Sequence, residues 1–583
     1  MILQALSDYY RRKCDDPDPA QRLPAFGLEQ KEIPFILKIS AEGELLQLRD
    51  TREQQGKKKL ARVFRVPMGV KKTSGVAANL LWDTLEYVLG VDTKGKPERV
   101  AEQHAAFRAR IEALPETARE DAGIQAVLRF LQRLDLAQLE RQPAWSDALE
   151  SNAVMSFRLH GDMDLVCQRP AVVQAALNTT GEDEAPQAMC LVTGERAPVE
   201  RLHASIKGVW GAQTSGANIV SFNARAFESY GKTERQGENA PVSRSAAFAY
   251  TTALNHLLRK DSSQRMQVGD ASTVFWADKQ DPFETIFGDI FQDNPDGGTA
   301  AVRALLDAVH SGHWGQSDEN LRYHVLGLAP NAARISIRFY HCVTLRELGQ
   351  RIAQHFEDLS LARGPNDPQY PSLFRLLTAV ALQNKADNIP PNLGGAIVDS
   401  ILAGPDTLYP SLWLNAAVGR CRAEQTVNYL RAAAIKACLN RHIRFRHGTE
   451  KEFLPMLDLS NTRPAYRLGR LFAVLEKIQE EASPGLNATI RDRYYGAASS
   501  TPVAVFTTLL RLKNAHLKKL APGRVTAFEK LLGEVLGPVN DFPKHLPLPD
   551  QGRFALGYYH QRQDFFTRKP QDNATDTTEG ETA

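Results

Sequence analysis

The chain lacks several features that would assign a protein to a class at once. No apolar run reaches the roughly 18 residues that a membrane-spanning helix needs, and no basic leader followed by an apolar stretch opens the sequence. The six cysteines are scattered without a Cys-x-x-Cys pair, so neither a disulfide framework nor a cysteine-rich zinc site is expected. We therefore expect a soluble cytoplasmic protein with no membrane partner, no metal and no cofactor.

An excess of charge of one sign is also missing. The sequence has 71 lysines and arginines against 68 aspartates and glutamates, for a net charge of +3. Any binding of nucleic acid must therefore come from local basic patches. The length of 583 residues predicts about two to four domains of roughly 100 to 200 residues each.

Two stretches of the sequence are locally basic. Residues 49–72 hold nine lysines and arginines against two acidic residues, and residues 485–525 hold seven against one. A simpler explanation stays open for both, because lysines guard exposed strand edges and charges cover the solvated face of helices. The candidate DNA contacts in these stretches are Lys57, Lys58, Lys59, Arg511, Lys518 and Lys519.

A short turn at the end of the first basic stretch reads Lys-Lys-Thr-Ser-Gly, residues 71–75. Two cations and two hydroxyls beside a glycine suit contacts with phosphates and with base edges. The upstream glycine spacing of a nucleotide-binding phosphate loop is missing. Lys71, Lys72, Thr73 and Ser74, with Asn79 after them, are therefore candidate nucleic-acid contacts.

A second candidate lies at residues 206–223, where Gly208, Gly211 and Gly216 fall within nine positions. The glycines allow close backbone approach, and the side chains between them are neutral and polar. The spacing fits neither a phosphate loop nor a nucleophile elbow. A glycine-rich connection between two strands is the alternative explanation. The candidate contacts are Gln213, Thr214, Ser215 and Asn218.

The pattern of apolar residues predicts an α+β multidomain fold. Residues 1–365 form a mixed α/β portion with small antiparallel sheets, including a hairpin over 33–49 with Gly43 in the turn. Helical periodicity follows, in a connecting region (366–455) and an all-α C-terminal bundle (456–569). The polar, acidic tail (570–583) is predicted to be disordered.

An enzyme is the main alternative from another class. His355 and Asp358 lie three positions apart on a predicted helix over 344–361, and His341 precedes it, so a metal-dependent nuclease could use these three residues. An i, i+3 pair more commonly forms a surface hydrogen bond. Cys190 and His203 could be two metal ligands, but the sequence offers no two further ligands at a workable spacing.

Thirteen short segments, in order between about residue 1 and about residue 560, together resemble the large subunit of the type I-C CRISPR Cascade surveillance complex. They are Lys72-Thr-Ser-Gly75, Asn79-Leu-Leu-Trp-Asp83, Tyr87-Val-Leu-Gly90, Cys190-Leu-Val-Thr-Gly194, Ile206-Lys-Gly208, Gly211-Ala-Gln213, Ser221-Phe-Asn223, Ser229-Tyr-Gly231, Asn239-Ala-Pro241, Thr252-Ala-Leu-Asn255, Val325-Leu-Gly-Leu-Ala-Pro-Asn331, Gly469-Arg-Leu-Phe472 and Ile490-Arg-Asp-Arg-Tyr494.

The resemblance implies a non-catalytic subunit that recognises the protospacer-adjacent motif of foreign double-stranded DNA. Such a subunit aids duplex opening, stabilises the R-loop and recruits a separate helicase-nuclease. Its implied partners are crRNA, the target duplex, the displaced single strand, and the backbone and guide-end-binding subunits of Cascade. By analogy with glutamine wedges in related large subunits, Gln213 is expected to insert beside the first unpaired base. A scaffold that touches guide RNA and neighbouring subunits without reading the motif stays open.

The C-terminal helices resemble the small subunit of the same complexes, which type I-C systems are thought to make from an internal start. Met456 is well placed for that start. The preceding dipeptide, Lys451-Glu452, can be encoded AAGGAG, a ribosome-binding sequence. We therefore expect a separate helical product that begins near Met456 and whose cations line a path for single-stranded DNA.

Overall fold

A computed structural model describes residues 1–18, 21–55, 58–70, 75–178, 186–232, 236–269, 271–291, 297–449 and 451–566. The chain divides into two compact units, Met1–Ala204 with Val220–Leu254, and Ser205–Ile219 with Asn255–Ala583. The boundaries predicted at residues 365 and 455 fall inside the second unit and remain predictions about a finer division. No helix in the described ranges is both long enough and apolar enough to cross a membrane.

The first unit is built on a four-stranded sheet in the order β3-β2-β8-β7. The predicted hairpin is confirmed as β2 (Phe35–Ile39) and β3 (Leu45–Asp50), and Gly43 has the positive φ of 86° that its turn requires. β2 also pairs in parallel with β8 (Val154–Leu159). The residues of β2 and β8 are almost fully buried, so this pair forms the centre of the unit's core.

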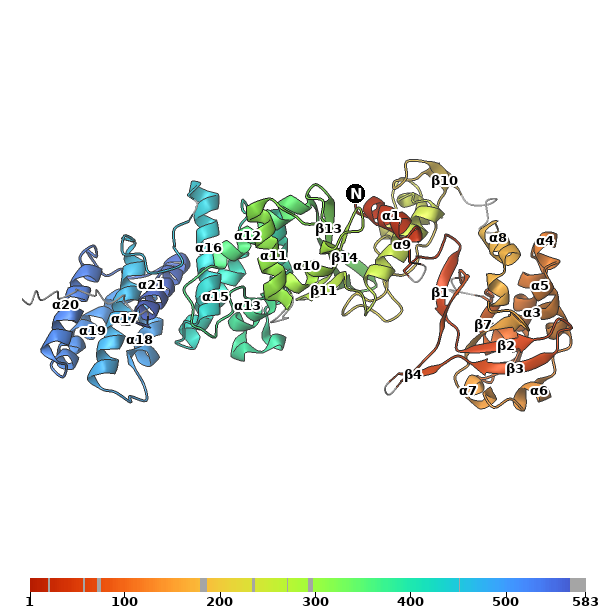
Figure 1. Cartoon of the computed structure of the whole chain (residues 1–583), viewed down its shortest axis with the longest axis horizontal. Helices are drawn as coiled ribbons and strands as arrows, with labels where there is room; N and C mark the ends of the chain where they lie inside the picture. The colour runs from red at the N-terminus through yellow and green to blue at the C-terminus, as the bar shows by residue number, and fades with distance from the viewer. Residues whose placement is uncertain are drawn as a thin grey trace, which may run out of the picture. The chain divides into compact units, whose positions relative to one another are not determined.

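Two amphipathic helices, α3 (Pro97–Glu112) and α5 (Ala122–Gln132), pack on this sheet. Phe107 and Phe130 from these helices approach Phe157 of β8, with ring centroids 6.4 Å and 5.8 Å away. The remaining elements of the unit are α1 (Ile2–Cys14), β1 (Leu28–Glu32), β4 (Glu53–Gln55), β5 (Lys58–Leu60), β6 (Val63–Pro67), β7 (Trp82–Thr84), α2 (Leu85–Leu89), α4 (Glu116–Arg119), α6 (Leu136–Glu140), α7 (Trp145–Glu150), η1 (Val166–Gln168), α8 (Pro170–Asn178), β9 (Gln187–Met189), β10 (Arg196–Pro198), η2 (Arg225–Phe227) and η3 (Gln236–Asn239). Figure 1 labels several of them, among them α1, β1, α8 and β10. Helix α9 (Arg244–Leu257) spans the division between the units.

The second unit begins with an antiparallel sheet in the order β11-β12-β13-β14. Its strands are β11 (Arg265–Val268), β12 (Ala271–Ala277), β13 (Arg322–Asn331) and β14 (Arg334–Thr344). The register of β13 and β14 shifts between Gly327 and Leu328. This bulge disturbs the alternation that the sequence of β14 predicts, and Ile337 is 40% exposed.

Every described element after β14 is helical, which confirms the α+β multidomain class. Helices α17 (Pro464–Ala482) and α21 (Leu548–Phe566) lie side by side (Figure 1). A Cβ atom at Gly469 or Gly557 would lie 2.0 Å from a carbonyl oxygen of the facing helix, so only glycine permits this approach. The other helices are α10 (Phe283–Phe291), α11 (Gly297–Ser311), α12 (Leu345–Leu359), α13 (Leu373–Val380), η4 (Leu382–Asn384), η5 (Ala386–Asn388), α14 (Leu393–Ala403), α15 (Ser411–Ala423), α16 (Tyr429–His447), α18 (Ile490–Ala498), α19 (Pro502–Leu517) and α20 (Pro522–Leu536).

Candidate nucleic-acid interface

The glycine-rich segment 206–218 forms a loop whose two ends are joined. Ile206 and Ala217 form an antiparallel bridge, in which each N–H donates to the other's carbonyl oxygen at 2.8 Å and 2.9 Å. Asn218 then bridges to Arg334, and its carbonyl oxygen accepts from the N–H of Ile335 at 3.0 Å. The loop is therefore continuous with the edge of β14 in the second unit.

Side chains outside the loop hold its first half in place. The N–H of Lys207 donates to Asn255 Oδ1 at 2.7 Å, and Asn255 Nδ2 donates to the carbonyl oxygen of Ser205 at 3.2 Å. The N–H of Trp210 donates to Ser272 Oγ on β12 at 2.9 Å. These bonds connect the loop to the end of α9 and to the β11-β12-β13-β14 sheet, so the base of the loop is fixed in position.

Two glycines let the backbone pass where no side chain fits. Gly208 has a φ of 86°, and a Cβ atom there would lie 2.6 Å from the carbonyl oxygen of Leu258. Gly216 has a φ of 91°, and its Cβ would lie 2.8 Å from the carbonyl oxygen of Ile206. Both positions combine a left-handed backbone with a close approach, which explains why the loop needs glycine there.

The tip of the loop carries the predicted polar contacts. Gln213, Thr214 and Ser215 are exposed, and the N–H of Gly216 donates to the carbonyl oxygen of Gln213 at 2.9 Å to close the turn. Asn218 lies at the base and is only partly exposed. The structure thus brings three of the four predicted residues together on one exposed tip and places the fourth below them.

Sequence reasoning missed Trp210, which is 60% exposed on the same loop. Tryptophan usually indicates a buried core position. The signal that could have identified it is its position inside a polar segment, directly before Gly211. In the structure Gly211 has a φ of 76°. The loop therefore combines an exposed aromatic face with amide and hydroxyl groups.

The N-terminal candidates are only partly described by the structure. Lys57 and the turn residues Lys71, Lys72, Thr73 and Ser74 lie outside the described residues. Lys58 belongs to β5, and its side chain is outside the description. Lys59 is exposed, and its Nζ lies 3.7 Å from Asp147 Oδ2.

Asn79 is a correction to the predicted contacts. Its side chain is buried, with the residue only 5% exposed. Its Oδ1 accepts from the N–H of Val70 at 2.9 Å, and its own N–H donates to Asp83 Oδ2 at the same distance. Asn79 therefore joins Val70 to Asp83 and does not present its amide to solvent.

The cations of the C-terminal helices fall into two groups. Lys513 Nζ donates to Glu529 at 3.1 Å, and Arg524 pairs with Glu481 at 2.6 Å. Arg511, Lys518 and Lys519 are exposed and have no ion pair within the part of the chain that the structure describes. Arg511 and Lys518 are seven residues apart, so they lie on one side of α19, about 10 Å apart along its axis.

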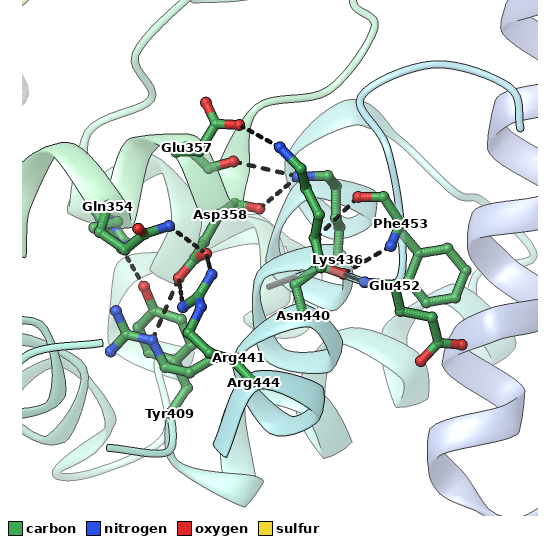
Figure 2. Close-up of polar contacts among 12 residues, drawn as sticks. Gln354, Glu357, Asp358, Tyr409, Lys436, Asn440, Arg441, Arg444, Glu452 and Phe453 are labelled. Atoms are coloured by element: carbon green, nitrogen blue, oxygen red, sulfur yellow. Dashed lines mark hydrogen bonds and ion pairs between the residues drawn. The ribbon is translucent and has the colours of Figure 1, made fainter. Parts of the chain in front are cut away.

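The residues of the nuclease alternative each have a different partner. His355 Nδ1 bonds to Tyr409 Oη at 2.7 Å, and burial lowers the pKa of His355 to about 3. His341 Nε2 lies 2.7 Å from Asp399 Oδ1. Asp358, 1% exposed, accepts from Arg444 at 2.6 Å and from Arg441 at 3.3 Å, as Figure 2 shows. These contacts fit a structural role, because they join α12 to α16 and to the segment before α15, and join β14 to α14.

The two possible metal ligands Cys190 and His203 also have other partners. Cys190 Sγ accepts from the N–H of Ser243 at 3.2 Å. Burial would raise the pKa of this thiol, but hydrogen bonds from Ser243 and Thr193 lower it to about 7. His203 Nδ1 bonds to Tyr250 Oη at 2.7 Å. Within the described ranges, no group of three or more His, Cys, Asp or Glu residues could hold a metal ion.

The family model described as "CRISPR-associated protein (Cas_Csd1)" matches residues 6–566, nearly the whole chain. A search of curated proteins finds no match.

Proposed function

Because the chain belongs to the Cas_Csd1 family of CRISPR-associated proteins, we propose that it is the non-catalytic large subunit of a type I-C Cascade complex in the cytoplasm. Its partners are then crRNA, the target duplex, the displaced strand, and the backbone and guide-end-binding subunits. In this role it recognises the protospacer-adjacent motif, aids duplex opening and R-loop stabilisation, and recruits the helicase-nuclease.

The observation that carries the proposal is the loop 206–218. A side chain that separates stacked base pairs must be held rigidly, because a mobile one would yield to the stack. The loop base is fixed by its bridge and by Asn255 and Ser272, while Gln213 and Trp210 are exposed. Inserting such groups offsets an unstacking cost of roughly a few kcal/mol per base step.

Guide pairing and duplex opening form a nearly balanced strand exchange in RNA-guided DNA recognition. Small protein contributions to a short duplex motif are then sufficient to decide whether opening starts. In our proposal, Lys71 and Lys72 supply contacts to phosphates or purine acceptors, and Gln213 and its neighbours act at the first separated base pair. Asn79 accepts from the N–H of Val70, the residue directly before these lysines in the sequence.

Equilibrium binding of the assembled complex to duplexes with an intact or a scrambled motif tests this function. Gln213→Ala is expected to reduce the preference for the intact motif by about 5- to 150-fold, which corresponds to a loss of about 1 to 3 kcal/mol that offsets unstacking at the first opened base step. Gln132→Ala, an exposed glutamine at the end of α5, is the matched control and should leave the preference unchanged. Equal binding of both duplexes by the wild-type complex would support the scaffold alternative instead.

The salt dependence of binding distinguishes the contribution of Lys71 and Lys72 from that of the loop 206–218. If Lys71 and Lys72 contact phosphates, the double alanine variant weakens binding to both duplexes. The slope of log K against log salt then becomes shallower by about 0.9 per lost contact. Loss of motif preference without that change in slope would make the lysines base readers. An unaltered affinity and slope would remove them from the interface.

We further propose that translation from Met456 yields a separate small subunit. Both close glycine contacts between α17 and α21 lie within this product, so its central helix pair is complete. Recoding Lys451 and Glu452 with synonymous codons is expected to remove the short product while the full chain persists. Replacement of Met456 by Leu is the second arm, and a short band that survives both changes would place the start elsewhere.

The nuclease alternative is tested with the purified full-length chain. Incubation with Mg²⁺ or Mn²⁺ and single- or double-stranded DNA is expected to leave the DNA uncut, in wild type and in His341→Ala. Metal-dependent cleavage that His341→Ala abolishes would overturn the non-catalytic assignment.

A further inference from the structure

A second exposed aromatic residue lies in the first unit, on the turn formed by residues 229–232. Tyr230 is 97% exposed and has a φ of 55°. A non-glycine residue in the left-handed region costs roughly 1 kcal/mol or more. The backbone of Tyr230 is therefore strained although the aromatic ring of this residue lies in solvent.

The side chain of Asn239, at the end of η3, holds this turn closed. Its Oδ1 accepts from the N–H of Ser229 at 2.9 Å, and its Nδ2 donates to the carbonyl oxygen of Lys232 at 3.1 Å. Lys232 Nζ in turn donates to the carbonyl oxygen of Glu238 at 2.8 Å. One amide thus bridges both ends of the turn, so the backbone that carries Tyr230 is fixed although its ring is free to contact a ligand.

Two aromatic residues of this segment lie between two cationic residues in the sequence. Phe227, three residues before Tyr230, is 45% exposed. Arg225 is exposed beside it in η2, and the ammonium of Lys232 is held next to the turn. An apolar protein partner would need further apolar neighbours around the tyrosine, whereas Asn223 and Ser229 are exposed there. Rings beside cations suit unpaired bases together with their phosphates.

We propose that Tyr230 is a stacking platform for an unpaired nucleobase, with Arg225 and Lys232 close to the adjoining phosphates. The ligand class is single-stranded nucleic acid, in which every base offers a π face. The proposal goes beyond motif recognition, because it requires neither a duplex nor a particular sequence. Its failure would leave the role of the loop 206–218 untouched, and the reverse also holds.

Binding of the full-length chain to fluorescent 15-nucleotide probes tests the platform. The probes are oligodeoxyadenylate, oligoriboadenylate and an abasic strand with the same number of phosphates. Tyr230→Ala is expected to weaken both adenylate probes by about 5- to 150-fold, the range for loss of one stacked base, and to leave the abasic strand unchanged. Tyr230→Phe keeps the ring and should stay within about 2-fold of wild type.

Tyr230→Asn separates stacking from folding. Asparagine tolerates the left-handed backbone better than tyrosine does, so this variant should fold at least as stably as wild type and yet bind adenylate as weakly as Tyr230→Ala. Measuring the Tyr230 variants also in an Arg511→Ala/Lys518→Ala/Lys519→Ala background removes the contribution of these C-terminal cations to adenylate binding. The two adenylate probes show whether RNA or DNA is preferred.

Three results would overturn the proposal. The first is unchanged adenylate binding by Tyr230→Ala and Tyr230→Asn. The second is an equal loss for the abasic strand, which would make the contact one of charge alone. The third is wild-type affinity for adenylate in a Tyr230→Leu variant, because a side chain without a π face would then suffice.

Discussion

Replacing Asp358 by alanine removes the anion at the centre of the cluster in Figure 2 and should strongly destabilise the second unit. Arg441 is fully buried and Arg444 largely so, with side chains 0% and 15% exposed, and both bond to this carboxylate. Lys436, 1% exposed, donates to the backbone carbonyl oxygen of Asp358 at 3.0 Å. Burial lowers the pKa of Lys436 to about 8, so the cluster already holds a third cation that is costly to bury.

The magnitude follows from what the substitution leaves behind. Removing one partner of a buried ion pair costs about 3 to 5 kcal/mol, mainly because the remaining charge is left uncompensated. Arg441 keeps a bond from its Nη1 to the carbonyl oxygen of Ser400 at 2.9 Å, and its guanidinium carbon lies 3.9 Å from the centroid of the Tyr409 ring. These contacts hold the side chain in place but do not neutralise it. We therefore expect a loss of about 3 to 5 kcal/mol.

Glu357 provides a matched control one position earlier on the same helix. Its carboxylate lies 3.5 Å from Lys451 Nζ, and its side chain is 54% exposed. An exposed ion pair contributes about 0 to 1 kcal/mol, so Glu357→Ala should change little. The backbone carbonyl oxygen that Glu357 offers to Lys436 at 3.3 Å survives the substitution.

Urea unfolding followed by tryptophan fluorescence, with hydrogen exchange of α12 and α16, measures both variants. Asp358→Ala should lower the midpoint by roughly 1 to 2.5 M for an m-value of about 2 to 3 kcal/mol/M and should release protection in both helices. Glu357→Ala should overlay the wild type. Equal effects of the two variants would refute the reasoning that burial of the charges, and not their pairing alone, sets the cost.

Three further predictions concern the loop 206–218, the buried residue His355 and the C-terminal cations. Gly216→Ala should abolish motif preference without unfolding the chain, because its Cβ would meet the carbonyl oxygen of Ile206. Gly485→Ala is the control, since Gly485 has a φ of 79° but open space around it. Equal motif binding by both variants would contradict the requirement for glycine at position 216 of the loop. Burial lowers the pKa of His355 to about 3, below about 6.5 in the unfolded chain, so its contribution to stability is complete above about pH 6.5 and falls by about 2 kcal/mol at pH 5. Urea titrations at pH 8 and pH 5 should therefore show a smaller loss of unfolding free energy in His355→Gln than in wild type. An equal loss in the two proteins would disprove the assignment. Replacing the three exposed cations Arg511, Lys518 and Lys519 by alanine together should weaken single-strand binding. It should also reduce the slope of log K against log salt by up to about 2, given about 0.7 per contact, and a wild-type slope would exclude these residues from the path of the strand.

Local signals in the sequence were sufficient for much of the fold. The hairpin around Gly43 follows from strand alternation interrupted by a turn residue, and the helix that begins at Pro502 follows from a proline in its first turn. Residues 85–89 show the limit of such signals. Helix α2 begins only at Leu85, because Trp82–Thr84 pairs as a strand with β8, 70 or more residues away in the sequence.

Side-chain partners distant in sequence explain what could not be predicted at the site. The polar tip at Gln213 was identifiable from composition, but only the structure shows that Trp210 is exposed and that its N–H donates to Ser272 Oγ. Asn79 fits a polar contact by residue type, and only the positions of Val70 and Asp83 show that it is buried. Lys513 lies within an apolar stripe, and its partner Glu529 belongs to the next helix.

The most direct test of the central claim is a photocrosslink from the tip of the loop. A benzophenone amino acid at position 213, in the assembled complex with a guide-matched duplex, should crosslink to the nucleotides where the protospacer-adjacent motif meets the first opened base pair. The same group at position 132 in α5 should give no DNA crosslink. Crosslinks from position 213 to guide RNA or to other subunits, without any to the motif junction, would contradict the proposed role of the loop.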